Sequence, residues 1–211
     1  MSYQLYFTAT SCGAASYISA KKAGLIGDKV VPNLVDIREH KVKSGALKDT
    51  DYYKVNPKGN VPTLVLEDGT VLNENAAVLQ KIADLAPSGA LAPANGTNAR
   101  YLLQSKLSYI SSEVHSSYGP LFNPALSDEV KKWTLAKIAT KLDYLNRVEL
   151  AGKKYIVGDS FTVADAYLYI VLSWSKYVGV DLSEYPEVER YFKGISELDF
   201  VKEAHAEMNK F

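Results

Sequence analysis

The chain has one cysteine, three histidines and no excess of either charge. Its 211 residues carry 24 lysines and arginines against 24 aspartates and glutamates, so the formal net charge is zero. Because proteins bind nucleic acids mainly through an excess of positive charge, this balance argues against a nucleic-acid partner. One cysteine cannot form an internal disulfide. Three scattered histidines, with no H-x-x-x-H pair, argue against a metal site.

Long apolar runs are absent as well. The longest, from Ala166 to Leu172, has seven residues, whereas a membrane-spanning helix needs about 20. The first seven residues lack the basic and apolar regions of a signal peptide. The sequence also has no P-loop, no G-x-G-x-x-G motif and no G-x-S-x-G motif. We therefore expect a soluble cytoplasmic protein with no membrane partner.

The first 86 residues alternate between strand-like and helix-like segments. Strands are predicted at Gln4–Phe7, Val30–Ile37, Thr63–Glu67 and Thr70–Leu72, the last two joined by a two-residue Asp68-Gly69 turn. Pro32 predicts an edge position or an interruption in the second strand. Apolar residues at helical spacing predict helices near 13–23 and 75–86.

Residues 87–97 are rich in Pro, Gly, Ala and Ser and predict a linker. Beyond them strand signals nearly vanish, and helices are predicted at 98–118, 128–150, 163–178, 187–195 and 199–209. Ser127 fits a helix N-cap, and Thr162 with Asp165 fits a capping box. The sequence thus predicts an α/β domain over residues 1–86 and an all-α domain over residues 98–211.

Cys12 lies between the first predicted strand and the first predicted helix. A helix N-terminus favours the thiolate and lowers the pKa of a thiol, and Gly13 leaves the adjacent backbone open to a ligand. The alternative is that Cys12 is a small buried apolar residue, which is the more common role of a lone cysteine. Ala15 and Ser16 follow, so a Cys-x-x-Cys dithiol oxidoreductase is excluded.

Three other positions have both a structural and a functional interpretation. The backbone of Val61, before Pro62, either starts a strand or pairs with an extended peptide. Glu74 and Asn75 begin a predicted helix, where they form either a solvated cap or part of an anion site. His115 is either a surface or core histidine, the more common case, or a catalytic one.

Four segments of the chain together resemble the cytosolic glutathione transferase family. They are Ser11-Cys12-Gly13, the stretch from Tyr53 to Pro62 with Asn-Pro-Lys-Gly-Asn-Val-Pro, Leu72 to Asn75, and the stretch from Phe161 to Tyr167. Cys12 together with Glu113-Val114-His115 most resembles the bacterial beta class. The resemblance implies a thioredoxin-like first domain, an all-helical second domain that lines the electrophile pocket, and a homodimer. It also implies glutathione, γ-Glu-Cys-Gly, as cosubstrate, without a metal.

Site residues follow from the same resemblance. Cys12 would face the glutathione sulfur, with Ser11 as the alternative, and His115 would reach in from the helical domain. Val61, before a cis Pro62, would pair with the glutathione backbone.

The two ends of glutathione would be held by other side chains. Glu74 and Asn75 would hold the γ-glutamyl end. The candidates for the glycine carboxylate are Arg38, His40 and Lys41, of which we select Lys41. The sequence departs from the beta-class pattern at three positions: Gly13 and Asn75 replace the usual serine and the usual serine or glycine, and Ser108 stands where asparagine is expected.

The function implied is that of a detoxifying glutathione transferase acting on hydrophobic electrophiles. Two reactions of the site remain open: conjugation of glutathione to the electrophile, and thiol transfer through Cys12, with peroxidase as a further side activity. Cysteine favours thiol transfer because it exchanges readily with disulfides. The rival is a non-catalytic glutathione-binding, ligand-binding or regulatory protein of the same fold. The presence of Cys12, Glu74 and His115 together argues against this rival.

Overall fold

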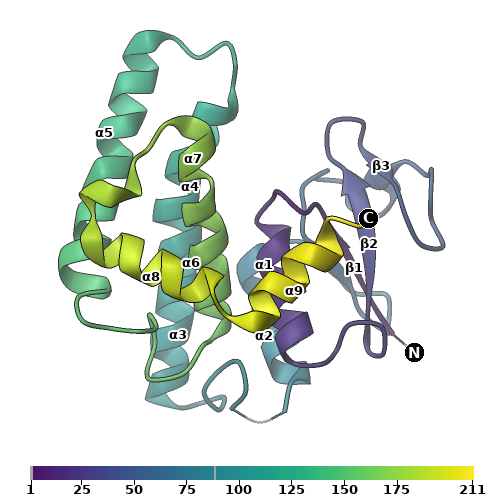
Figure 1. The fold of residues 1–211 in the computed structure, drawn as a ribbon. Coiled ribbons are helices and arrows are strands. Elements are labelled where there is room, and N and C mark those ends of the chain that lie inside the picture. The colour runs from purple at the N-terminus through teal and green to yellow at the C-terminus, as the bar shows by residue number, and fades with distance from the viewer. Residues whose placement is uncertain (1, 88) are drawn as a thin grey trace.

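The computed structural model describes residues 2–87 and 89–211, so Met1 and Ser88, the latter in the predicted linker, lie outside it. A sheet with two helices comes first, and a helical bundle follows (Figure 1). The strands are β1 (Tyr3–Phe7), β2 (Val30–Asp36), β3 (Lys41–Val42), β4 (Thr63–Val65) and β5 (Val71–Leu72). The main helices are α1 (Gly13–Lys22), α2 (Asn75–Leu85), α3 (Asn98–Tyr109), α4 (Ser116–Tyr118), α5 (Asp128–Tyr144), α6 (Val163–Ser173), α7 (Ser175–Val178), α8 (Pro186–Ser196) and α9 (Asp199–Met208).

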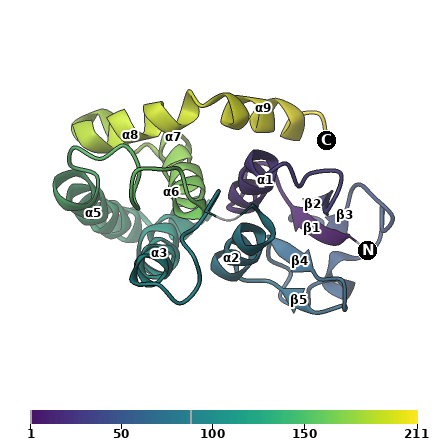
Figure 2. The ribbon, with the colours of Figure 1, turned by 90° about the horizontal axis from the view of Figure 1, so that it is seen from below.

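Over the described residues the sheet has the strand order β3-β2-β1-β4-β5. β1 runs parallel to β2 across the α1 crossover and antiparallel to β4. Strand alternation points Leu5 and Phe7 of β1 into the main core beneath α1 and α2, whereas Tyr6 joins a smaller core with Tyr52 on the opposite face. Figure 2 shows α1 and α2 between the sheet and the helical bundle.

Two details of the predicted strands can be compared with the structure. β3 pairs with β2 only at Val35 and Asp36. At Pro32, the pairing between the described strands is therefore with β1 alone, on one side of β2. The edge position predicted for Pro32 is therefore confirmed. The predicted two-residue turn is wrong. Leu66 N donates to Thr70 O and Gly69 N donates to Leu66 O, which makes a three-residue loop with Gly69 at φ +84°.

Two of the predicted long helices are interrupted by π-helical segments. Segment η2 (Ile110–His115) separates α3 from α4, and segment η4 (Leu145–Glu149) extends α5. The two predicted caps are present: Ser127 accepts a hydrogen bond from Val130 N, and Asp165 accepts one from Thr162 N. None of the helices in the described ranges is both long and apolar enough to cross a membrane.

Helix α9 leaves the helical bundle and lies along α1, so the end of the chain returns to the first domain (Figures 1 and 2). Glu207 on α9 accepts hydrogen bonds from Lys21 and Tyr17 of α1. The ring of Phe211 meets that of Phe7 edge to face, at 5.6 Å between centroids. Residues of both halves thus share one apolar core, which fixes the walls of the site.

Candidate active site

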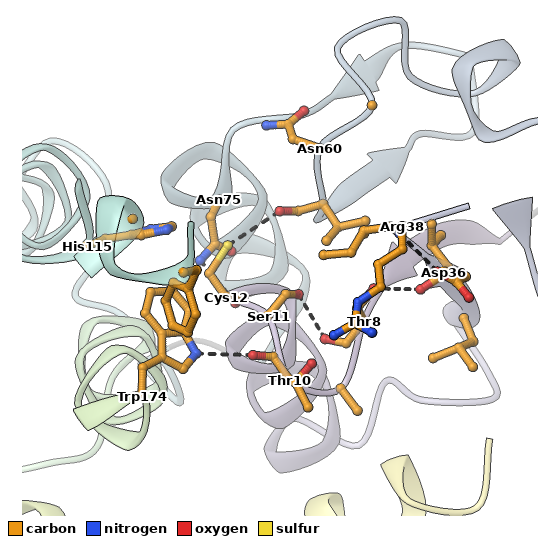
Figure 3. A pocket seen from close by; sticks show the side chains of 18 of the residues that line it. Thr8, Thr10, Ser11, Cys12, Asp36, Arg38, Asn60, Asn75, His115 and Trp174 are labelled. Atoms are coloured by element: carbon orange, nitrogen blue, oxygen red, sulfur yellow. Dashed lines mark hydrogen bonds between the residues drawn. The ribbon is translucent and has the colours of Figure 1, made fainter. Parts of the chain in front are cut away.

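A cavity of about 1390 Å³ opens between the sheet domain and the helical bundle. Among the candidate residues named from the sequence, those lining it are Ser11, Cys12, Arg38, Val61, Glu74, Asn75 and His115. Figure 3 shows Cys12 and Asn75 near the middle of this cavity, His115 on one side and Arg38 on the other. The sequence-predicted residues therefore converge on one place, although they come from both halves of the chain.

The loop after β1 holds Cys12 at the start of α1. Thr8 Oγ1 donates to Val35 O at 2.6 Å, and Ser11 Oγ donates to Thr8 O at 2.8 Å while it accepts from Gly13 N (Figure 3). The hydroxyl proton of Ser11 is thus used within the loop. The space predicted for a ligand beside Gly13 is in fact occupied, because a Cβ there would meet the Cβ of Phe7 at 3.1 Å. This glycine allows α1 to pack closely on β1.

The thiol of Cys12 is buried, with 8% of the residue exposed, and it donates to Val61 O at 3.4 Å. Burial raises its pKa to about 12; a backbone hydrogen bond opposes this shift and the charge of Glu74 adds to it. The lowered pKa predicted from the helix N-terminus is therefore wrong for the free protein. Desolvation outweighs the helix because the thiolate would lie out of contact with water. Cys12 is a protonated thiol near pH 7.

Asn75 ties the N-termini of α1 and α2 together. Its Nδ2 donates to Cys12 O at 3.2 Å, and its Oδ1 accepts from Ser16 Oγ at 3.0 Å. Glu74 precedes it as the N-cap residue of α2 and forms an exposed ion pair of 2.7 Å with Lys58. The start of α2 therefore offers free backbone N–H groups next to a carboxylate at the cavity rim.

His115 enters the cavity from the π-helical segment η2. Its Nδ1 lies 2.7 Å from the hydroxyl of Tyr167, and its ring meets that of Trp174 at 4.8 Å between centroids. Burial lowers the pKa of His115, so the imidazole is neutral near pH 7. Ser111 of the same segment also lines the cavity. Ser108, where the beta class has asparagine, is exposed one turn earlier and is absent from this lining.

The lining residues that sequence reasoning missed include two aromatic ones, Tyr167 and Trp174. Trp174 Nε1 donates to Thr10 O at 3.1 Å, which joins the helical bundle to the loop before Cys12 (Figure 3). Its ring also meets that of Phe122 edge to face. The rarity of tryptophan was the one available signal for Trp174. Tyr167 lies in an almost entirely apolar helix, where a tyrosine is expected to be a packing residue.

The structure separates the three basic candidates. Arg38 lines the cavity, His40 stacks on Tyr53, and Lys41 lies exposed on β3 outside the cavity lining. Pro62, which follows a cis peptide bond, is buried behind Val61 at the start of β4. Within residues 2–87 and 89–211, no group of three or more histidine, cysteine, aspartate or glutamate side chains is placed to hold a metal ion.

Comparison with known families accounts for this combination of sheet, bundle and shared cavity. The glutathione S-transferase N-terminal domain model matches residues 33–85, and the glutathione S-transferase C-terminal domain model matches residues 106–199. The chain belongs to the glutathione S-transferase family. The predicted family and the predicted fold class, a thioredoxin-like α/β domain followed by an all-α domain, are both confirmed.

The relatives of this glutathione transferase include bacterial proteins. It is 35% identical to glutathione S-transferase GstA of Escherichia coli O157:H7, across 95% of this chain and 96% of that one. A sphingomonad glutathione S-transferase, solved in complex with glutathione, matches with a TM-score of 0.89 and 37% identity over 98% of both chains. A bacterial beta-class glutathione S-transferase of Sphingomonas chungbukensis matches with a TM-score of 0.89 and 36% identity, over 99% of this chain and 100% of that one. The predicted likeness to the beta class is confirmed, and a transferase is favoured over the non-catalytic rival.

Proposed function

We propose that this glutathione transferase binds glutathione on the sheet side of the cavity and conjugates its sulfur to a hydrophobic electrophile held by the helices. The observation that carries this proposal is the division of one cavity into two kinds of wall. The sheet side supplies backbone groups, helix N-termini and charged side chains, and the bundle side supplies aromatic rings. We assign glutathione binding to residues 1–86, the linker to 87–97 and the electrophile wall to 98–211.

Glutathione is extended and charged at both ends, which suits the sheet side. The backbone of Val61 pairs with its cysteinyl residue as an added strand would. Glu74 receives the γ-glutamyl ammonium, and the N–H groups at Asn75 receive the carboxylate beside it. Arg38 replaces Lys41 as the residue for the glycine carboxylate, because Arg38 is the one of the two that lines the cavity.

In the conjugation step the glutathione thiol loses its proton to solvent and the thiolate attacks the electrophile. With 1-chloro-2,4-dinitrobenzene, a carbon–sulfur bond forms and chloride leaves. Cys12, protonated in the free protein, acts as a hydrogen-bond donor beside the thiolate, which lowers the free energy of that charge. A serine donates as well as a thiol, so Cys12→Ser should keep or increase the conjugation rate.

Steady-state conjugation tests this function against the rival. The wild-type protein should convert the dinitrobenzene substrate with saturation by glutathione. Tight retention on immobilised glutathione, combined with turnover at the uncatalysed rate on several electrophiles, would instead establish a binding protein.

Thiol transfer is the second candidate, since Cys12 lines the cavity next to Val61. In that reaction the Cys12 thiolate attacks glutathione disulfide, a mixed disulfide forms and one glutathione leaves as a thiolate. Intact-mass spectrometry after incubation with glutathione disulfide tests it, with Cys12→Ser as control. One adduct at pH 7, absent from the variant, supports thiol transfer, whereas adduct formation only at strongly alkaline pH argues against it.

We also propose a cytoplasmic homodimer. A free thiol without a disulfide partner suits a reducing compartment. Tyr101 and Leu102 at the start of α3 are 61% and 47% exposed, and these adjacent apolar side chains offer a surface for a second copy to cover. Sedimentation of the wild type and of Leu102→Asp tests the dimer: a monomeric wild type contradicts it.

A further inference from the structure

The hydroxyl of Tyr167 lies where the two halves of the site meet. Tyr167 is 1% exposed, and its oxygen is 2.7 Å from Nδ1 of His115. Burial raises its pKa well above the ordinary value, and the charge of Cys12 adds to this shift. The phenol is therefore protonated near pH 7, and the question is which atom receives its single proton.

Asn75 lies beside this hydroxyl, and the orientation of its side-chain amide is fixed by two hydrogen bonds. Ser16 Oγ donates to Oδ1 and Cys12 O accepts from Nδ2, so the nitrogen cannot be exchanged with the oxygen without losing both bonds. Asn75 and Ser111 oppose the effect of burial on the pKa of Tyr167, which means that their side chains face the phenol oxygen. Within the described residues, the side-chain hydrogen bond of this buried hydroxyl joins it to Nδ1 of His115, which is therefore the available acceptor for its proton.

We propose that Tyr167 donates its proton to Nδ1 of His115, and that Asn75 keeps it in that orientation. His115 then carries its own proton on Nε2 and presents a donor to the cavity. Tyr167 and Asn75 are positioning residues in this arrangement, acting on substrate through His115. Asn75 is also one of the three positions at which this chain departs from the beta-class pattern.

The chemical consequence rests on the proposed function. A neutral imidazole with Nε2–H stabilises a glutathione thiolate by donating to it, whereas the opposite tautomer would present a base. The titratable groups that share the cavity are Tyr167 and Tyr177 from the bundle, Cys12 and Glu74 at the helix starts, and Asp36, Arg38 and Lys43 at the far end of the sheet. Glu113, the acidic residue on the same segment as His115, is paired with Lys141.

Nitrogen NMR of the full-length protein, labelled with ¹⁵N-histidine and free of glutathione, tests the tautomer directly. The three histidine signals are assigned with His40→Gln and His205→Gln variants. We expect His115 near pH 7.5 to show an unprotonated Nδ1 and a protonated Nε2. A protonated Nδ1 would overturn the proposal. Because no glutathione is present, this result is independent of whether the proposed function holds.

Tyr167→Phe and Tyr169→Phe form a matched pair for the kinetic test. Tyr169 lies on the same helix and its hydroxyl bonds to Nε2 of His205 at 3.0 Å, away from the cavity lining. Tyr167→Phe should mix the tautomers of His115 and shift the pH profile of kcat/KM for conjugation upward by about one unit, because the thiolate loses a donor. Tyr169→Phe should change neither the tautomer of His115 nor the pH profile of kcat/KM. Identical profiles for the two variants would contradict the inference.

Asn75→Asp provides a second route if Tyr167→Phe folds poorly. The substitution keeps the shape but replaces the N–H donor with an acceptor, so the phenol proton should turn to the new carboxylate. His115 should then move to the Nδ1–H tautomer in the same spectrum. Retention of the wild-type tautomer in Asn75→Asp would remove Asn75 from the proposal. Calorimetry with glutathione reports separately on binding, and its failure in the wild type would overturn the proposed function alone.

Discussion

Arg38 and Lys41 are three residues apart, yet they have different surroundings. The carboxylate of Asp36, at the end of β2, accepts hydrogen bonds from the backbone N–H groups of Arg38 and Glu39. These bonds turn the chain so that Arg38 lies along the cavity (Figure 3). Lys41 follows on β3, where its neighbour Val42 points into the small core and Lys41 points to solvent. Position in the turn, and not charge alone, selects the binding residue.

Arg38→Ala should therefore weaken glutathione binding by about tenfold, the lower end of what a charge-assisted hydrogen bond contributes. Glutathione monoethyl ester, which lacks the glycine carboxylate, should bind equally to the variant and the wild type. Calorimetry with both ligands measures this difference, and Lys41→Ala is the matched control. The assignment is wrong if Lys41→Ala loses affinity and Arg38→Ala does not.

The reactivity of Cys12 should follow from its raised pKa. Near pH 8 almost all of the thiol is protonated, so alkylation by iodoacetamide should be at least tenfold slower than that of free cysteine. The folded protein also holds this proton more tightly than the unfolded chain. The resulting stability is present below about pH 8.5 and is lost as the pH rises toward about 12.

Quenched alkylation with mass detection gives the rate, and urea unfolding of Cys12→Ala gives the stability control. The variant should lose less stability than the wild type between pH 8 and pH 10. Rapid alkylation at pH 7 would show that the helix N-terminus, and not burial, governs this thiol.

Sequence reasoning located the polar residues of the site but not their protonation. Cys12, Val61 and Glu74 lie in motifs whose spacing is visible in the chain. The pKa of Cys12 and the role of Tyr167 depend on burial and on partners more than 50 residues away, which no local pattern encodes. Arg38 and Lys41 are both basic, and the turn geometry that separates them is a tertiary feature that the sequence does not show.

At the scale of elements, helix α6 is held by a carboxylate that does more than cap it. Asp165 is fully buried and accepts from Thr162 N, Thr162 Oγ1, Ile156 N and Tyr191 OH, each at 2.8 Å. The capping box predicted the first of these contacts. The others tie α6 to the preceding loop and to α8. Asp165 therefore fixes the helix that carries Tyr167.

Asp165→Asn should lower the free energy of unfolding by about 2–3 kcal/mol, because the amide nitrogen would face donors that need an acceptor. Urea unfolding near pH 7 measures the loss. Thr162→Val, which removes one hydroxyl and keeps the carboxylate, is the control and should cost about 1 kcal/mol. Equal losses of unfolding free energy in Asp165→Asn and Thr162→Val would mean that the contact between Thr162 and Asp165 accounts for the whole stabilisation.

The π-helical segments explain why helix prediction was less accurate than fold prediction. The apolar spacing of residues 98–118 fits a continuous α-helix, and the register change at Ile110–His115 has no composition of its own. Its effect is local but important, because His115 and Ser111 both reach the cavity from this segment. The arrangement of strands and helices followed from periodicity, and the exact direction of His115 did not.

The whole molecule behaves as one unit because helix α1 contacts both halves. It packs on α2 in the sheet domain and on α6 and α9 in the helical half. Trp174 Nε1 also reaches across to Thr10 O. Both tryptophans, Trp133 and Trp174, lie in the helical domain, whereas Cys12, the one thiol, lies in the sheet domain. Trp133 fluorescence therefore reports on the helical half, Trp174 fluorescence on the contact between the halves, and alkylation of Cys12 on the sheet half. A shared core predicts that these signals change together.

The ion pair between Lys21 and Glu207 tests this coupling. The hydrogen bond from Lys21 is the main cause that lowers the pKa of Glu207. The stabilisation of the fold by this ion pair is therefore present above the ordinary glutamate pKa near 4.3 and is lost as the pH falls through the lowered pKa. Glu207→Gln should cost about 0.5 kcal/mol at pH 7, since the pair is partly solvent-exposed, and progressively less as the pH falls through the lowered pKa of Glu207. In urea the tryptophan and Cys12 signals should shift by the same amount. A shift in one signal alone would mean that α9 stabilises only one half of the chain, because a shared core transmits any loss at this contact to both.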